Sequence, residues 1–95
     1  MKRILITQTP SLKTVLEEDY NLKFDRILTG PDTGLITNQH VFGDIPIETA
    51  SYCSYLTLVK LSLPSNLAID HLTDDQIREH LQPLKTFVIH QIDPV

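Results

Sequence analysis

Short apolar runs alternate along the chain with segments in which apolar residues recur every three or four positions. Runs rich in β-branched side chains are typical of buried strands. The spacing of Leu12, Val15 and Leu16 is typical of one face of a helix. We predict strands at residues 3–7, 24–28, 37–42, 57–63 and 84–92, and helices at residues 9–20, 44–55 and 73–82.

Start and stop signals set the predicted ends of these helices. Pro46 suits the first turn of the second helix, and the carboxylate of Asp44 is expected to cap it. Thr73 and Gln76 match a capping box at the start of the third helix, which Pro83 ends. Residues 30–34 contain two glycines and a proline, so we predict a turn or loop there.

The resulting order, β-α-β-β-α-β-α-β, indicates an α/β fold: a mostly parallel sheet with helices on both faces. Such sheets bind ligands at the carboxyl ends of strands, where the strand order reverses. Those ends are residues 7–11, 42–44 and 63–66. With 95 residues, the chain predicts a single domain, residues 1–95, whose thin core favours a homodimer.

The charge pattern narrows the choice of partners. The net charge of −4 argues against a protein that coats DNA or RNA. Residues 1–30 nevertheless hold five basic groups against four acids, while residues 31–95 hold three against eight. A small anionic ligand near the N-terminal half therefore remains open.

Several classes of protein have no sequence signal here. The apolar runs are too short to span a membrane, and no signal peptide pattern is present. The single cysteine, Cys53, cannot form an internal disulfide, so we expect a cytoplasmic protein. The four histidines lack paired metal spacing, and no glycine-rich nucleotide loop occurs. We therefore expect neither a metal nor a cofactor.

Two strand-to-helix turns carry the candidate chemistry. The first offers hydroxyls, an amide and N–H groups at a helix start, which can hold a phosphate or simply cap the helix. The second begins with a glycine, which lets a ligand approach the backbone, although an ordinary capped turn fits equally well. The candidate binding residues are Thr7, Gln8, Thr9, Pro10 and Ser11 in the first turn and Gly43, Asp44, Ile45 and Pro46 in the second.

Four segments match a known pattern in the same order and at similar spacing. Residues 40–50 resemble an apolar-x-Gly-x-Leu-Pro-Val-x-x-Ala stretch, and residues 61–67 resemble Leu-x-Leu-Pro-x-x-Leu. Residues 72–75 resemble Leu-Thr-x-Asp, and residues 6–10 resemble a Val-Thr-Arg-His-x-Gly turn. Over nearly its whole length the chain thus resembles a small family of ring nucleases associated with type III CRISPR systems, the Csx-sixteen type.

The resemblance implies a Rossmann-like, CARF-like three-layer sandwich that acts as a homodimer without metal. Such proteins bind the messenger cyclic tetra-adenylate and cut it to linear di-adenylate, which ends the immune signal. The ribose 2′-hydroxyl attacks the neighbouring phosphate, and the protein holds the reacting atoms in line and stabilises the developing charge. On this resemblance we expect Thr7, Gln8, Lys13 and His40 to be catalytic, with Lys13 as a cation and His40 as acid or base.

Departures from the family's pattern keep two other functions open. Gln8-Thr9 stands where the family has Arg-His, Ala68-Ile69 where it has Arg-Gly, and Asp44 where it has threonine. Each change removes positive charge or adds negative charge near the expected site. The alternatives are a sensor or sponge that binds a cyclic nucleotide without cleaving it, and a dimeric interaction protein.

Overall fold

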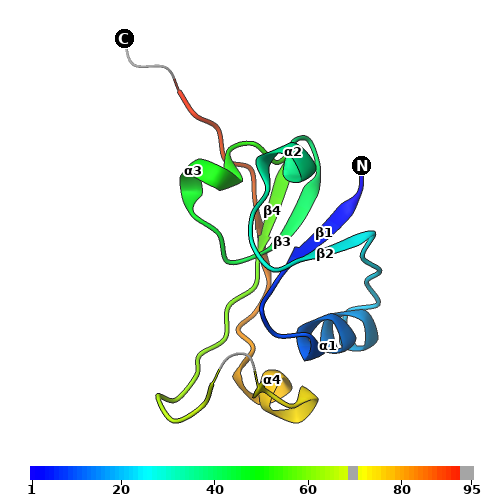
Figure 1. Ribbon diagram of the computed structural model, residues 1–95, viewed down its shortest axis with the longest axis vertical. Coiled ribbons are helices and arrows are strands. Elements are labelled where there is room, and N and C mark those ends of the chain that lie inside the picture. Colours follow the sequence, from blue (N-terminus) through cyan, green and yellow to red (C-terminus); the bar gives the residue numbers. More distant parts are fainter. Residues whose placement is uncertain (69–70, 93–95) are drawn as a thin grey trace.

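Strands and helices alternate through the computed structural model, which describes residues 1–68 and 71–92 (Figure 1). The elements are β1 (Arg3–Ile6), α1 (Ser11–Asp19), β2 (Arg26–Leu28), α2 (Thr33–Ile36), β3 (His40–Gly43), α3 (Ile47–Ala50), β4 (Tyr55–Leu58), α4 (Asp74–His80) and β5 (Lys85–Phe87). No helix among the described residues is long and apolar enough to cross a membrane.

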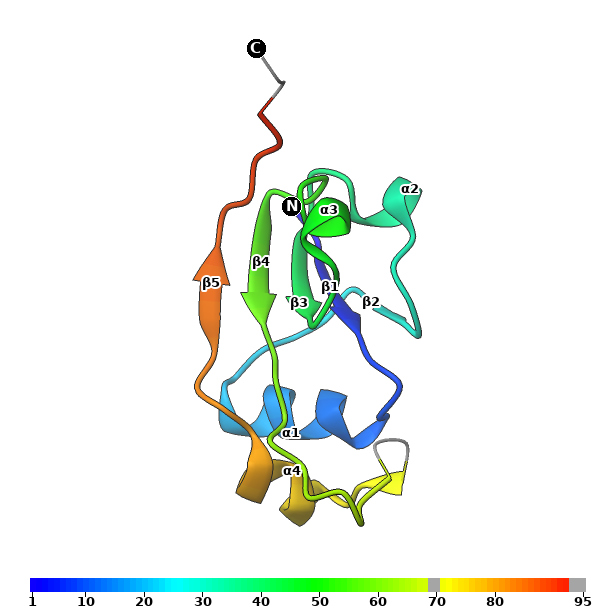
Figure 2. The same cartoon turned by 90° about the vertical axis from the view of Figure 1, so that its left-hand side faces the viewer.

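All the strands join one five-stranded sheet in the order β2-β1-β3-β4-β5. The first four strands are parallel, and β5 runs antiparallel to β4 (Figure 2). The chain leaves β1 for β2 on one side and then returns to β3 on the other, so the strand order reverses between β1 and β3. This confirms the predicted α/β fold with a mostly parallel sheet.

The two faces of the sheet bury separate apolar clusters, because successive side chains of a strand point to opposite faces. Ile4, Ile6 and Val41 pack with residues of α2 and α3, whereas Leu5 and Phe42 pack with residues of α1 and α4. The first cluster is Ile4, Ile6, Ile36, Val41, Ile45, Ala50, Cys53 and Leu56. The second cluster is Leu5, Leu12, Val15, Leu16, Phe42, Val59, Leu72 and Ile77. Helices therefore cover both faces, as predicted.

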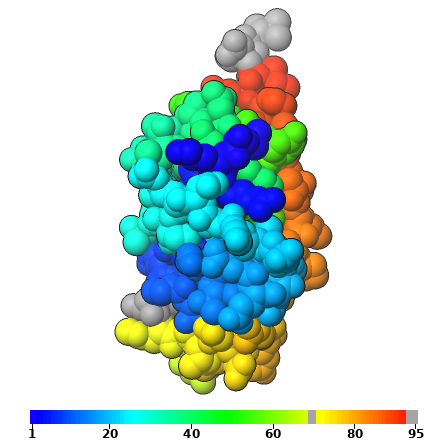
Figure 3. All heavy atoms as spheres, turned by 90° about the vertical axis from the view of Figure 1, so that its right-hand side faces the viewer, coloured from blue at the N-terminus to red at the C-terminus, as the bar shows by residue number. Residues whose placement is uncertain are grey.

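Helices α1 and α4 pack against each other at the end of the molecule toward which the parallel strands point (Figures 2 and 3). The predicted apolar stripe of α1 is confirmed, since Leu12, Val15 and Leu16 are buried. The predicted capping box of α4 is also confirmed. The Thr73 hydroxyl accepts the Gln76 N–H at 3.2 Å, and the Gln76 side-chain oxygen accepts the Thr73 N–H at 3.0 Å.

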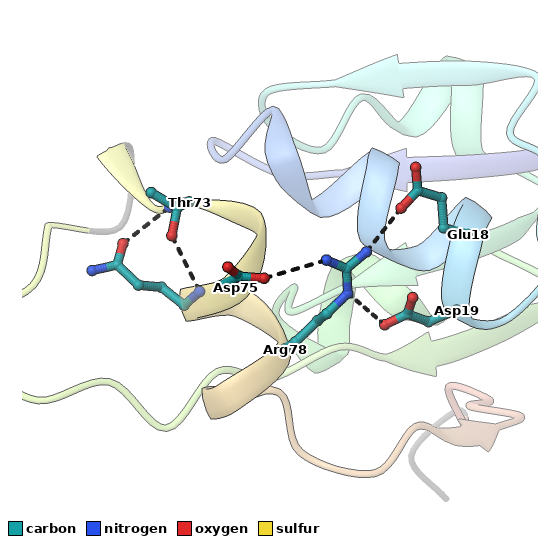
Figure 4. Close-up of polar contacts among 6 residues, drawn as sticks. Glu18, Asp19, Thr73, Asp75 and Arg78 are labelled. Carbon is teal, nitrogen blue, oxygen red and sulfur yellow. Dashed lines mark hydrogen bonds and ion pairs between the residues drawn. The ribbon is translucent and has the colours of Figure 1, made fainter.

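Arg78 joins these two helices through ion pairs (Figure 4). Its guanidinium lies 2.8 Å from Glu18 and 2.9 Å from Asp19 on α1, and 3.6 Å from Asp75 on α4. The Asp19 and Glu18 carboxylates raise the pKa of Arg78, with the hydrogen bond to Asp19 as the largest cause. Ion pairs thus join the acidic C-terminal end of α1 to Arg78 on α4.

The second predicted helix, at residues 44–55, is wrong in length and in its cap. Helix α3 is one turn long, and its N-cap residue is Pro46, without a side-chain cap from Asp44. The chain turns after Ala50 because its backbone bonds to the loop before β3, with the Ser54 N–H donating to the Gln39 carbonyl at 2.9 Å. Strand β4 then begins at Tyr55, paired with His40.

The predicted loop at residues 30–34 contains the start of a helix that the sequence patterns did not indicate. The Asp32 carboxylate accepts the Gly34 N–H at 3.0 Å and caps α2. The single turn that follows buries Ile36 completely. Strand β2 begins later than the predicted 24–28, at Arg26, and β3 begins later than the predicted 37–42, at His40.

The last two predicted strands, 57–63 and 84–92, are too long, since β4 ends at Leu58 and β5 ends at Phe87. A bulge interrupts the pairing where β4 ends and β5 begins. Leu58 lies opposite Lys85, and the next bridge joins Leu61 to Leu81. Two residues on the first strand therefore face three on the returning one, which include Pro83. A proline cannot donate a ladder hydrogen bond, so the regular pairing ends there.

Candidate functional site

The carboxyl ends of the parallel strands open onto a cavity of ≈ 440 Å³. This volume falls within the range of about 300–1,000 Å³ that is common for small-molecule sites. The cavity spans the point between β1 and β3 where the strand order reverses. It is lined by Ile6, Thr7, Gln8, Thr9 and Leu12, by Thr29, Gly30 and Pro31, by Asp44, Ile45 and Pro46, and by Val59, Lys60 and Leu61.

The structure brings both predicted turns to this cavity. Thr7, Gln8 and Thr9 line it from the turn after β1, and residues 44–46 line it from the turn after β3. Gly30 and its neighbours complete the wall after β2. Polar groups from segments far apart in sequence thus face one space with an apolar floor.

A local hydrogen bond orders the turn after β1. The Thr7 hydroxyl accepts the Thr9 N–H at 2.9 Å and lies 3.3 Å from the Thr9 carbonyl. Thr9 itself is only 1% exposed, so it supports the turn more than it presents a surface. Pro10 and Ser11 begin α1 without a side-chain cap and are not among the residues that line the cavity.

Gly43 serves the contact between two strands. A Cβ atom at this position would lie 2.8 Å from the carbonyl oxygen of Ile6, and φ is 156°. Real Cβ atoms essentially never come so close to a backbone oxygen. The glycine therefore lets β3 end directly beside β1. Gly43 is not among the residues that line the cavity.

Two predicted catalytic residues lie away from the cavity. The Lys13 ammonium is 2.9 Å from the Glu17 carboxylate on the exposed side of α1, and this hydrogen bond is the main cause that lowers the pKa of Glu17. His40 begins β3 and so lies about 13 Å from Asp44 along the strand. Neither Lys13 nor His40 is among the residues that line the cavity with Thr7 and Gln8.

His40 belongs to a polar row on the sheet. Its Nε2 lies 2.7 Å from the Thr57 hydroxyl, which lies 2.8 Å from the Thr86 hydroxyl, and its ring stacks on Phe42 at 4.3 Å. Burial lowers the pKa of the imidazole, and the charge of Arg3 lowers it further. The neutral ring is therefore favoured in the folded protein.

Lys60, which no sequence pattern singled out, lines the cavity just after β4. Its ammonium group forms no ion pair with any residue that the structure describes. Asp44 brings the opposite charge to the same cavity. The sequence held one sign of Lys60 as a candidate: it is the only charged residue within the otherwise apolar run 58–61.

The comparisons with known proteins add no relative. No protein-family model, no curated protein and no solved structure matches the chain. Within residues 1–68 and 71–92, no group of three or more histidine, cysteine or acidic residues is placed to hold a metal ion. Of the departures noted in the sequence, Ile69 lies outside the described residues. The structure thus has an α/β fold with a cavity at the carboxyl edge of its sheet, lined by polar and apolar residues.

Proposed function

We propose that the chain is a ring nuclease that binds cyclic tetra-adenylate in this cavity and converts it to linear di-adenylate, which ends type III CRISPR signalling. The observation that carries the proposal is the place of the cavity, at the strand-order reversal between β1 and β3. α/β sheets bind nucleotides at this position. The resemblance of residues 6–10, 40–50 and 61–67 to ring nucleases supplies the identity of the ligand, and the domain is then of the Rossmann-like, CARF-like type.

The size of the cavity favours two copies of the chain acting together. At ≈ 440 Å³, the cavity suits one part of a four-nucleotide ring better than the whole. A twofold dimer would present two such cavities to a ligand that is itself nearly symmetric. A homodimer is therefore part of the proposal.

The lining groups suit an attack by the ribose 2′-hydroxyl. The bond from the 2′-oxygen to phosphorus forms as the bond to the 5′-oxygen breaks, and the 2′ proton ends on the leaving oxygen. Thr7 and Gln8 would hold the sugar and phosphate in line for this displacement. Lys60 would stabilise the negative charge that develops on the phosphate, which is the role first expected of Lys13.

A binding protein without nuclease activity is the second candidate. The described lining residues include no histidine, and the cation Lys60 is balanced by Asp44. The described lining thus lacks the side chain that most often moves protons in catalysis, which is histidine. Such a protein would oppose signalling as a sponge that lowers the free concentration of the messenger.

Incubation with radiolabelled cyclic tetra-adenylate in EDTA, read by thin-layer chromatography beside a binding assay, separates these functions. A di-adenylate product supports the nuclease, and binding without product supports the sponge. The absence of both product and binding would contradict both functions. Lys60→Met should weaken binding about tenfold, since a charged hydrogen bond is lost. Lys23→Met is the matched control, because Lys23 is exposed and is not among the lining residues.

A further inference from the structure

The bulge between β4 and β5 opens a second cavity, of ≈ 280 Å³. It is lined by Leu58, Lys60, Gln82, Pro83 and Lys85. Leu58 lies opposite Lys85 in the last regular pair, and pairing resumes at the bridge between Leu61 and Leu81. The extra residue on the returning chain separates the two segments, and the cavity lies at this interruption.

Two lysines line this small space. Lys60 and Lys85 flank it, and none of the residues that line it is acidic. Neither lysine forms an ion pair within the part of the chain that the structure describes. Like charges that share a site repel, and an anion between them turns the repulsion into attraction. Two lysines without an acidic residue in the lining suit this cavity to an anion such as a phosphate group.

Neighbouring polar groups hold the shape of this cavity. The Gln82 side-chain N–H group donates to the Ser62 hydroxyl at 2.7 Å, and the Gln82 backbone N–H donates to the Lys60 carbonyl at 2.9 Å. The Ser62 N–H donates to the His80 carbonyl at 2.9 Å. The chain on both sides of the bulge is thus fixed before any ligand arrives.

The two cavities are neighbours because Lys60 lines both of them. We propose that the second cavity is an anion subsite of the same ligand site, so that the bound ligand places one phosphate in each cavity, with Lys60 between them. The ligand class is then a nucleotide chain with at least two phosphates, rather than a mononucleotide. This inference rests on the proposed nucleotide-binding function of the first cavity.

Calorimetric titration of the full chain with adenosine monophosphate and with 5′-phosphorylated di-adenylate tests the subsite. The di-adenylate should bind about tenfold tighter or better, because it gains a second set of charged contacts. Lys85→Met should remove this advantage and leave binding of the monophosphate unchanged. Lys60→Met should weaken binding of both probes, and Lys23→Met should alter neither.

The outcomes distinguish a failure of the subsite from a failure of the proposed function. If neither probe binds the unaltered chain, the nucleotide site fails and the subsite fails with it. If the monophosphate binds and the di-adenylate binds no tighter, only the subsite is overturned. The same holds if Lys85→Met preserves the ratio of the two affinities. NMR spectra provide a readout that needs no variant. The backbone amide signal of Gln82 should shift when di-adenylate is added and should not shift when the monophosphate is added.

Discussion

Gly43 is the residue on which the meeting of β1 and β3 depends. A side chain at this position would press against the carbonyl oxygen of Ile6, 2.8 Å from the new Cβ atom. We expect Gly43→Ala to lower the free energy of unfolding by about 1–3 kcal/mol, because backbone atoms must move. Urea unfolding followed by circular dichroism measures the change.

Gly30 is the matched control, because it lies at the same edge of the sheet and a Cβ atom added there would have nothing within 4 Å. Gly30→Ala should change the free energy of unfolding by no more than about 0.5 kcal/mol. Equal effects of the two substitutions would contradict the close approach of the strands at Gly43.

His40 makes stability depend on pH in a defined direction. Its pKa in the folded protein lies below the ordinary 6.5 because burial disfavours the charged ring. The unfolded chain therefore binds the proton more readily, and stability rises with pH. The contribution is fully present above about pH 6.5 and is lost as the pH falls through that value toward the folded pKa. The urea midpoint, measured from pH 8 down to pH 5, should fall.

His40→Gln isolates this effect, since glutamine keeps a polar group beside Thr57 but does not titrate. The urea midpoint of the variant should fall less than that of the unaltered chain over the same pH range. Because the other histidines remain, only the difference between the two profiles reports on His40. Identical profiles would exclude it as the source.

At the scale of elements, the α1–α4 contact combines a buried apolar surface with exposed charge. Ile77 is fully buried, while the Arg78 guanidinium and its carboxylate partners lie at the surface. Exposed ion pairs are screened by salt, whereas apolar contacts are not. We expect Arg78→Met to lower the melting temperature at low salt, and the difference from the unaltered chain to shrink in 1 M sodium chloride.

Arg78→Lys keeps the positive charge but lacks the guanidinium group that reaches Glu18 and Asp19 at the same time. It should therefore lower the melting temperature at low salt less than Arg78→Met does. A loss that is the same at both salt concentrations would show that Arg78 acts by packing its aliphatic stem rather than by its ion pairs.

The elements also show what the sequence could predict. The stripe of α1 and the capping box at Thr73 were found because both are local patterns. The ends of β4 and β5 depend on which strands pair and on a bulge at Pro83, which no local pattern encodes. The turn after β1, which lines the first cavity, was also predicted from a local pattern. Lys60 was missed because the predicted strand ran through it.

At the scale of the whole molecule, the second apolar cluster joins the two ends of the chain. It places Leu5 and Leu16 beside Leu72 and Ile77. A fragment of residues 1–70 would lack α4 and β5 and expose this surface. We expect the fragment to show little tertiary structure by NMR and to bind a hydrophobic dye. The full chain is the control, and a cooperative urea transition in the fragment would contradict the expectation.

The same cluster has a consequence for synthesis. Strand β1 and helix α1 leave the ribosome well before α4, the helix that packs with them in this cluster. The apolar side chains of β1 and α1 are therefore left uncovered until α4 has been translated. During that interval the nascent protein presents the apolar surface that chaperones bind.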